Sequence, residues 1–443
     1  MSPKRTPRTA GASPAAPPPG AAQPSAAAAA AEGADVQSFE AAGVPALLRR
    51  NPANEIVAVR LYMRGGSSGL DARHAGAEVL YARAARRGTR GFSKERLNAE
   101  LSRTGADLGA GAGEDYSVFH LRCVRRHFES VWKVFTDVVL HPLLEDAEVD
   151  VVRRQMLVEI RQRNDNPDGR LGELARELTY AGHPYEVNPA GTEAAVSALE
   201  PAMLFALARR RLRRSNLLLV AIGDLTREAL EACTAAPLGD LQDSEDPPGA
   251  PPPLRFERAD LRVEERELPT NYITGQFAAP SLADADYPAT LLAMSVLRDR
   301  LFEEVRTKRN LSYAPAAGLG NNTANLGWIY VTAVDPVTTM KVMLDEMRRL
   351  RDEPLDAQEL RNKVQVYITR YYLSNETNQA QASFLARYEL LGGGWERSRG
   401  FVSRLEALTP RDVQQAARNV LRNIQYAYLG DPKAADPTVF VDP

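Results

Sequence analysis

The sequence carries the same closing phrase twice, and this repetition limits what the chain can fold into. A largely apolar run ends in Gly-Asp at residues 217–224, and another ends in Gly-Asp at residues 424–431. The elements expected ahead of each phrase also repeat, as a strand, a helix, further strands and several charge-rich helices. We therefore predict an internal duplication of one α+β unit, with two unrelated α+β domains as the alternative.

Apolar patterning predicts the main elements of each unit. The expected strands are 56–62 and 116–124 in the first unit and 272–278 and 327–334 in the second, with helices at 74–87 and 287–307. Strands followed by runs of helices favour mostly antiparallel sheets with helices packed on one face. The predicted fold class is α+β, with two homologous domains.

Two low-complexity segments divide the chain. Residues 1–37 are rich in proline and alanine and have little to bury, so we predict a disordered tail. Residues 243–255 contain consecutive prolines, which cannot donate backbone hydrogen bonds, so we predict an extended linker. The two domains then occupy residues 38–242 and 256–443, and the linker is expected to let them pivot.

Composition excludes several classes of function. The 443 residues hold 55 basic and 57 acidic side chains, and a net charge of −2 gives no reason to expect a nucleic-acid partner. Only two cysteines are present, Cys123 and Cys233, which excludes a disulfide scaffold and favours small core residues. No apolar run is long enough for a membrane span. We expect a cytoplasmic protein, with a periplasmic or otherwise targeted one as the alternative, because prolines interrupt the N-terminal alanines.

Several phrases stand in a characteristic order after residue 38. They are GADL at 105–108, HPY at 183–185 followed by GTE at 191–193, LFEEVR at 301–306 leading to LSY at 311–313, and the two Gly-Asp endings. In this order they resemble the pitrilysin/insulinase family of zinc peptidases, especially its mitochondrial-processing-peptidase-like members. The resemblance covers nearly the whole chain after the tail. It implies that the two domains form a half-shell, one half of a clamshell.

The zinc motif of that family is missing here. Catalytic members carry H-x-x-E-H on the first helix of the N-terminal domain, where two histidines bind one ion and the glutamate is the general base. The matching positions hold Val79 and Arg83 in place of the histidines and Ala82 in place of the base. The resemblance therefore implies that this chain binds no metal, and Arg83 puts a cation where the ion would lie.

One carboxylate of the zinc site remains. The resemblance places the family's third ligand at Glu159, which we interpret as a relic of a ligand position. One carboxylate cannot hold zinc, and an ion pair with Arg163, four residues later on the same helix, explains Glu159 without a metal. A salt bridge between Arg83 and Glu159 across the vacated site is the alternative.

The remaining histidines offer no second metal site. All five histidines lie in the first half of the chain. His74 and Glu78 stand four apart on the predicted helix, which supplies only two ligands. His120 and His127 stand seven apart at a strand and are expected on opposite faces, so we interpret both as structural residues.

The second domain keeps two residues to which the resemblance gives a role. The family's C-terminal domain supplies an arginine and a tyrosine that hydrogen-bond the substrate carbonyl and stabilise the oxyanion, and the matching residues are Arg306 and Tyr313. Both side chains are hydrogen-bond donors, which suits developing negative charge. On their pattern alone they are a helix-end arginine and a tyrosine that opens a strand.

Some members of the family divide the active site between two chains. One chain carries the zinc motif, and the other carries the Arg/Tyr pair. This sequence has the second pattern, so the resemblance implies a non-catalytic subunit of a heterodimeric zinc metallopeptidase that is inactive alone. The expected partner is a homologous, zinc-bearing chain, and the expected substrate is a peptide or unfolded polypeptide. A scaffold or peptide-binding pseudopeptidase without proteolytic role is the alternative, and a peptide-binding homodimer is a third possibility.

Overall fold

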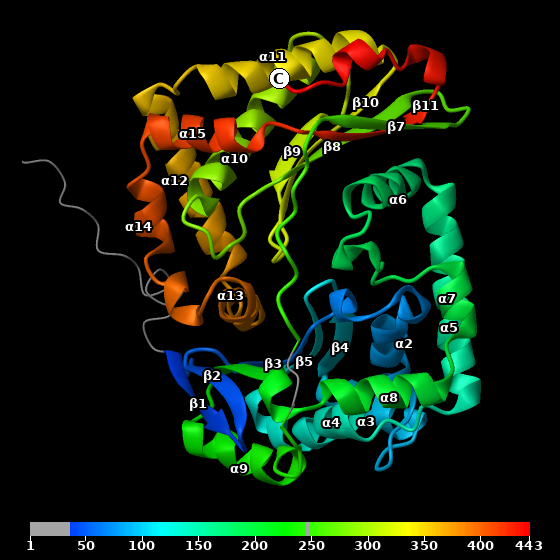
Figure 1. The fold of residues 1–443 in the computed structure, drawn as a ribbon. Helices are drawn as coiled ribbons and strands as arrows, with labels where there is room; N and C mark the ends of the chain where they lie inside the picture. Colours follow the sequence, from blue (N-terminus) through cyan, green and yellow to red (C-terminus); the bar gives the residue numbers. More distant parts are fainter. Residues whose placement is uncertain (1–35, 244–247) are drawn as a thin grey trace, which may run out of the picture.

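The computed structural model describes residues 36–243 and 248–443 of the chain, and Figure 1 shows the fold. The predicted tail lies outside the described residues except for Val36 and Gln37, which open the first strand. Of the predicted linker, residues 244–247 lie outside the described part, and residues 248–255 form no helix or strand.

The first half of the chain forms a six-stranded sheet. Its strands are β1 (Val36–Ala41), β2 (Val44–Arg50), β3 (Ile56–Arg64), β4 (Asp107–Ala112), β5 (Tyr116–Val124) and β6 (Leu217–Gly223). They lie in the order β1-β2-β6-β3-β5-β4, and all neighbours are antiparallel except β2 and β6. The strands predicted at 56–62 and 116–124 are confirmed as β3 and β5. The β1–β2 hairpin is absent from the prediction, because Pro45 and two arginines interrupt the apolar pattern of β2.

The second half forms a five-stranded sheet that repeats this order. Its strands are β7 (Asp260–Glu265), β8 (Asn271–Ala278), β9 (Ala316–Leu319), β10 (Leu326–Ala333) and β11 (Gln425–Gly430). The order β7-β11-β8-β10-β9 matches β2-β6-β3-β5-β4 position by position, and the single parallel pair, β7 with β11, recurs at the same place. The predicted α+β class with two similar, mostly antiparallel halves is confirmed.

Each half also contributes helices, most of which join the core on the outer side of its own sheet (Figure 1). Those of the first half are α2 (Ala77–Ala84), α3 (Lys94–Thr104), α4 (Phe128–Leu140), α5 (Asp146–Asp165), α6 (Pro167–Thr179), α7 (Glu193–Ala198), α8 (Pro201–Arg211) and α9 (Arg227–Leu238). Those of the second half are α10 (Tyr287–Leu301), α11 (Pro336–Asp352), α12 (Ala357–Ser374), α13 (Asn378–Leu391), α14 (Phe401–Glu406) and α15 (Pro410–Val420). The helix predicted at 287–307 is α10 continued by the π-helical segment Phe302–Thr307, and the helix predicted at 74–87 is α2 between two 3₁₀ turns.

Strand β6 is apolar throughout because both faces of its sheet are buried. Successive side chains of a strand point to opposite faces. Leu217, Leu219 and Ala221 belong to the core beneath the helices of the first half. The alternate residues, Leu218, Val220 and Ile222, pack against Ala382, Leu385, Ala386 and Trp395 of the second half. The inner face of the first sheet is therefore covered by α13 and the turn after it.

Strand β11 shows the reciprocal arrangement. Tyr426 and Tyr428 belong to the core beneath the helices of the second half. The alternate residues, Ala427 and Leu429, pack against Leu171, Leu174 and Ala175 of α6, which comes from the first half. The two halves thus exchange helices, and each sheet has a helix of the other half on its inner face (Figure 1).

This exchange contradicts the predicted pivot at the linker. A free pivot would expose the apolar residues of α6 and α13, which are buried only by contact with the opposite sheet. Polar contacts join the halves as well. The Asn51 side chain donates to Asn378 Oδ1 at 2.8 Å, and the backbone N–H of Ala324 donates to the Tyr185 hydroxyl at 3.2 Å. The two halves therefore form one folded body.

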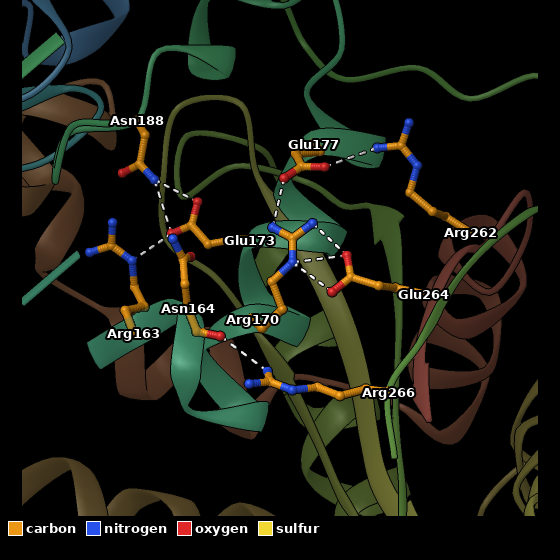
Figure 2. Close-up of polar contacts among 9 residues, drawn as sticks. All are labelled: Arg163, Asn164, Arg170, Glu173, Glu177, Asn188, Arg262, Glu264 and Arg266. Carbon is orange, nitrogen blue, oxygen red and sulfur yellow. Dashed lines mark hydrogen bonds and ion pairs between the residues drawn. The ribbon is translucent and has the colours of Figure 1, made fainter. Parts of the chain in front are cut away.

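Ion pairs reinforce the contact between α6 and the edge strand β7 (Figure 2). Arg170 of α6 donates to both carboxylate oxygens of Glu264 at distances between 2.6 and 3.0 Å, and also to Glu177 at 2.9 Å. Arg262 of β7 lies 3.3 Å from the other oxygen of Glu177. The hydrogen bonds from Arg170 hold the pKa of Glu264 below its usual value. These four residues make up the seam network.

Arg266, the residue after β7, forms hydrogen bonds with the end of α5. Its guanidinium donates to the main-chain oxygens of Asn164 and Asp165 at 3.0 and 2.8 Å (Figure 2 shows the first of these residues). The last carbonyls of a helix have no intrahelical partner and carry partial negative charge. Arg266 therefore anchors the C-terminal end of α5 to the second half.

Candidate functional site

Helix α2 presents the vacated zinc-motif positions to α5. Val79 and Arg83 lie one turn apart, four residues from each other, and Ala82 is buried beside them. Arg83 Nη1 lies 2.8 Å from both carboxylate oxygens of Glu159 on α5. The two side chains are 39% and 51% exposed, so the pair is open to solvent on one side. The predicted salt bridge between Arg83 and Glu159 across the vacated site is present.

The prediction that Arg163 pairs with Glu159 is wrong. Arg163 pairs with Glu173 of α6 at 2.8 Å, and Asn188 donates to the same carboxylate at 3.0 and 2.8 Å (Figure 2). The chain turns back at Asn166, whose side chain caps α6, and this reversal carries Glu173 to Arg163. Spacing along one helix could not reveal a competitor on the next.

A cavity of about 250 Å³ surrounds the vacated position. Its lining comes from α2, β4, α5, α6 and two loops: Val79, Arg83, Ala112, Glu114, Met156, Glu159, Ile160, Arg163, Arg176, Asn188, Pro189 and Ala190. Both carboxylates in this lining are already hydrogen-bonded to arginines, Glu159 to Arg83 and Glu114 to Arg176, each at 2.8 Å. We call this space the first-half cavity.

The donors around this cavity do not fit a zinc ion. A zinc site needs at least three side-chain ligands such as histidine, cysteine or carboxylate. Within residues 36–243 and 248–443, no group of three or more such side chains is close enough to hold a metal. At the motif positions, Val79 and Arg83 stand in place of the two histidine ligands, and Ala82 stands in place of the general base. No metal chemistry is therefore assigned to this chain.

His120 and both cysteines occupy structural positions, as predicted, whereas His127 belongs to the 3₁₀ turn Arg125–His127 after β5 and not to a face of that strand. His74 bonds Asp71 at 2.6 Å at the surface, and His120 lies on β5 with its Nε2 4.0 Å from Asp107. Cys123 is buried in the core of the first half. Cys233 lies on α9, partly buried, and both cysteines are free thiols.

A buried ion pair next to α2 is absent from the prediction. Glu78 and Arg211 are each 5% exposed, and Arg211 Nε lies 3.0 Å from Glu78 Oε1. Ser117 donates to the second oxygen of Glu78, and Arg211 donates to the main-chain oxygen of Gly66 at 2.7 Å. Burial raises the pKa of Glu78, while Arg211 and Ser117 oppose that rise. The pair ties α2 to α8, and only the acid at the start of α2 is visible as a signal in the sequence.

Arg306 and Tyr313 lie together at the surface of the second half. Arg306 belongs to the π-helical segment, and its guanidinium carbon lies 4.0 Å from the centroid of the Tyr313 ring and 4.8 Å from that of Phe302. Tyr313 is 78% exposed. It does not open a strand as predicted, because β9 begins only at Ala316, so Tyr313 stands in the preceding loop.

The loop that carries Tyr313 lies beside the inner face of the second sheet. Ser312 Oγ lies 3.5 Å from Thr332 Oγ1 on β10. Thr332 and Tyr330 are two residues apart and so point to the same face of that strand. The Tyr330 hydroxyl donates to Asp168 of α6 at 2.5 Å. Since α6 covers the inner face, the Arg306–Tyr313 region is at the side of the sheet that faces the first half.

Two family models match the chain in sequence. The model described as insulinase (peptidase family M16) matches residues 46–193, and the model described as peptidase M16 inactive domain matches residues 198–367. This chain belongs to peptidase family M16. The first match includes the vacated motif positions of the M16 chain, and the second includes Arg306 and Tyr313.

Curated relatives of this M16 chain are distant. An uncharacterized zinc protease of Streptomyces coelicolor is 25% identical over 351 residues, which is 76% of each chain. The probable mitochondrial-processing peptidase subunit beta of Schizosaccharomyces pombe is 21% identical over 259 residues, 58% of this chain and 57% of the other. Subunit 1 of the cytochrome b-c1 complex of Bos taurus is 20% identical over 241 residues, 54% of this chain and 50% of the other.

Solved structures share the whole fold. A peptidase M16 inactive domain from Pseudomonas fluorescens has a TM-score of 0.81 and 23% identity, with 89% of this chain and 97% of that chain covered. A protease from Helicobacter pylori has a TM-score of 0.82 and 14% identity, with 89% and 99% covered. No helix within the described ranges has the length and apolar character of a membrane span.

Proposed function

We propose that this M16 chain is the non-catalytic subunit of a heterodimeric zinc metallopeptidase. In this proposal it binds the peptide substrate and supplies Arg306 and Tyr313 to the active site of a homologous partner. One contrast carries the proposal: an arginine paired with Glu159 fills the position of the metal, whereas the Arg306 guanidinium makes no ion pair or side-chain hydrogen bond with any described residue. The chain lacks one half of a peptidase site and displays the other half.

The geometry of the Arg306–Tyr313 pair suits the binding of an oxyanion. The guanidinium of Arg306 makes cation–π contacts with the rings of Phe302 and Tyr313, its central carbon lying 4.8 and 4.0 Å from their centroids. Its N–H donors lie in the guanidinium plane and remain free to donate, and the exposed Tyr313 hydroxyl is a further donor. Donors fixed in advance stabilise developing negative charge without reorganising during the reaction.

A partner subunit supplies the rest of the site in this proposal. We expect zinc to be bound by a homologous chain with an intact H-x-x-E-H motif, and none by this chain. The Schizosaccharomyces pombe relative is named as one subunit of a peptidase, which supports a complex of several chains. The substrate class, peptides or unfolded polypeptides, follows from the family, and the cytoplasmic location stays a prediction.

Reconstitution tests this proposal. The chain purified alone should contain no zinc and cleave no peptide, and activity should appear when it is co-expressed with its zinc-bearing partner. Arg306→Ala or Tyr313→Phe should then lower kcat by about tenfold to a thousandfold, because each removes one donor to the oxyanion. Steady-state cleavage of a fluorogenic peptide measures this loss.

Arg309→Ala is the matched control for these variants. Arg309 lies three residues from Arg306, but its guanidinium is engaged by Glu304. We expect the control to retain kcat. Full activity of the partner alone, with no response to the Arg306 and Tyr313 variants, would overturn the proposal.

A scaffold role is the second candidate, and one comparison favours it. The Bos taurus relative is named as a subunit of the cytochrome b-c1 complex. A scaffold needs neither donor, so Arg306→Ala and Tyr313→Phe would then change neither assembly nor the activity of the complex. The same variants therefore separate the two functions.

A further inference from the structure

The first-half cavity has a counterpart in the second half of the chain. Helices α5 and α6 correspond to α12 and α13, and the second helix of each pair, α6 or α13, is the one that packs on the opposite sheet. On α5 and α6 the cavity is lined by Met156, Glu159, Ile160, Arg163 and Arg176. Residues with the same spacing on α12 and α13, Tyr367, Arg370, Tyr371, Ser374 and Arg387, line another cavity.

The first helix of each unit contributes equivalent positions too. Val79 and Arg83 of α2 line the first-half cavity, and Tyr287 and Leu291 of α10, with the same spacing, line the second. The second cavity, which we call the second-half cavity, has a volume of about 470 Å³ against about 250 Å³ for the first. The second-half cavity therefore occupies the same place in the second half that the vacated metal position occupies in the first half.

Aromatic side chains form the wall of the second-half cavity. The ring of Phe401 has its centroid 5.3 Å from that of Tyr371, 6.3 Å from Tyr367 and 6.4 Å from Phe384. Tyr388 lies 5.0 Å from Phe384, and Tyr287 completes the lining on the side of α10. Such a wall offers a large apolar contact area to a ligand.

Arg387 is one of two charged residues in this lining, with Arg370, and no carboxylate among the described residues neutralises it. Its counterpart in the first half, Arg176, pairs with Glu114 at 2.8 Å. Within the described residues, Arg387 has neither an ion pair nor a side-chain hydrogen bond. The tyrosines supply no negative charge, since burial raises the pKa of Tyr388 to about 12 and also raises that of Tyr367. Arg370 is exposed and lines the same cavity.

These features select the chemistry of the ligand. An aromatic cage without charge would suit a cation, but Arg387 and Arg370 repel one. An apolar group that carries a carboxylate satisfies both the rings and the arginines. The volume lies within the range of small-ligand pockets, about 300–1,000 Å³.

Two serines of the lining suit a peptide ligand. Ser374 and Ser383 line the cavity, and their hydroxyls donate to the helix carbonyls of Tyr371 and Gln379 at 3.0 and 2.8 Å. Each hydroxyl oxygen keeps lone pairs that can accept from the N–H groups of a peptide backbone.

We propose that the second-half cavity binds the C-terminal residue of a peptide, with an apolar side chain against the aromatic wall and the α-carboxylate on Arg387. This site shares no residue with the Arg306–Tyr313 pair. It goes beyond the proposed function, because a peptide end held here gives the chain its own affinity for substrate, whether or not a partner cleaves it.

Fluorescence anisotropy of the full chain tests the site. The probe is an N-terminally labelled hexapeptide that ends in Ala-Phe, prepared as the free acid and as the C-terminal amide. The free acid should bind at least about tenfold more tightly than the amide, because only the carboxylate forms an ion pair with the Arg387 guanidinium. Arg387→Gln should remove this difference, and Ala380→Phe, which fills the cavity, should weaken binding of both forms.

One arginine variant outside the cavity serves as the control. Arg361→Gln removes an exposed arginine of α12 that does not line the cavity and should leave binding unchanged. Binding that persists in Arg361→Gln and fails in Arg387→Gln supports the site independently of any peptidase activity. Equal affinity for acid and amide, no response to Arg387→Gln, no measurable binding, or tighter binding of 3-phenylpropionate than of the peptide would each overturn the proposal.

Discussion

Arg83 determines what α2 can bind. Val79 and Arg83 offer no ligand at the two histidine positions of the motif, and Arg83 also gives Glu159 a partner at 2.8 Å. The salt bridge is half-exposed, so its contribution to folding stability is small, about 0–1 kcal/mol. Its effect is on binding, because the one remaining ligand group is occupied.

Restoring two histidines should therefore restore a zinc site. In Val79→His/Arg83→His, the imidazoles lie one helical turn apart and Glu159 is freed as a third ligand. We expect about one zinc ion per chain after dialysis, measured by atomic absorption, where the original chain retains none. The same double variant with Glu159→Gln should bind much less. Equal zinc content with and without Glu159 would show that α5 does not complete the site.

The residues of the vacated site could be predicted because their spacing lies within one helix or follows the family motif. Val79, Ala82 and Arg83 required only the register of α2. The partner of Arg163 could not be predicted, because Glu173 reaches it through the turn between α5 and α6. Glu78 likewise looks like a surface acid in the sequence, and only the fold brings Arg211 to it.

At the scale of elements, the exchange of α6 and α13 explains the composition of β6 and β11. The apolar runs predict both strands as buried, which is correct, but a continuous apolar run does not say which element covers each face. Helix α13 has apolar residues on more than one side, since Leu385 packs against the first sheet and Tyr388 in the core of the second half, so its pattern names no single partner. A contact between residues far apart along the chain has no local signal.

Truncation of a buried leucine on each exchanged helix tests this arrangement. Leu174 of α6 and Leu385 of α13 are both buried against the opposite sheet. Leu174→Ala or Leu385→Ala should each cost about 2–5 kcal/mol of the free energy of unfolding, from lost burial and the cavity left behind. Urea unfolding measures the cost. Leu373→Ala, at an exposed site on α12, should change stability by no more than about 0.5 kcal/mol, and equal effects of all three would contradict the exchange.

Apolar contacts, hydrogen bonds and the charged seam network together join the two halves of the molecule. The apolar contacts, α13 on the first sheet and α6 on the second, are insensitive to pH. The seam network is different, because Glu264 must be ionised to accept three hydrogen bonds from Arg170. The seam also flanks α6, which supplies Arg176 to the first-half cavity and Asp168 to the inner face of the second sheet. Any change in how α6 is held is therefore transmitted to both inner surfaces.

Acid should loosen this seam before it unfolds the chain. Arg170 lowers the pKa of Glu264 in the folded state, so the stabilisation is complete above the unfolded value of about 4.3 and is lost as the pH falls through the folded value. Hydrogen exchange of the α6 amides, corrected for the intrinsic effect of pH, should accelerate below about pH 4, whereas that of α4, packed in the first core, should not. Glu264→Gln should show faster exchange of α6 already at pH 7 and a weaker acid response. If α6 in that variant follows the same pH profile as in the original chain, another group controls the seam.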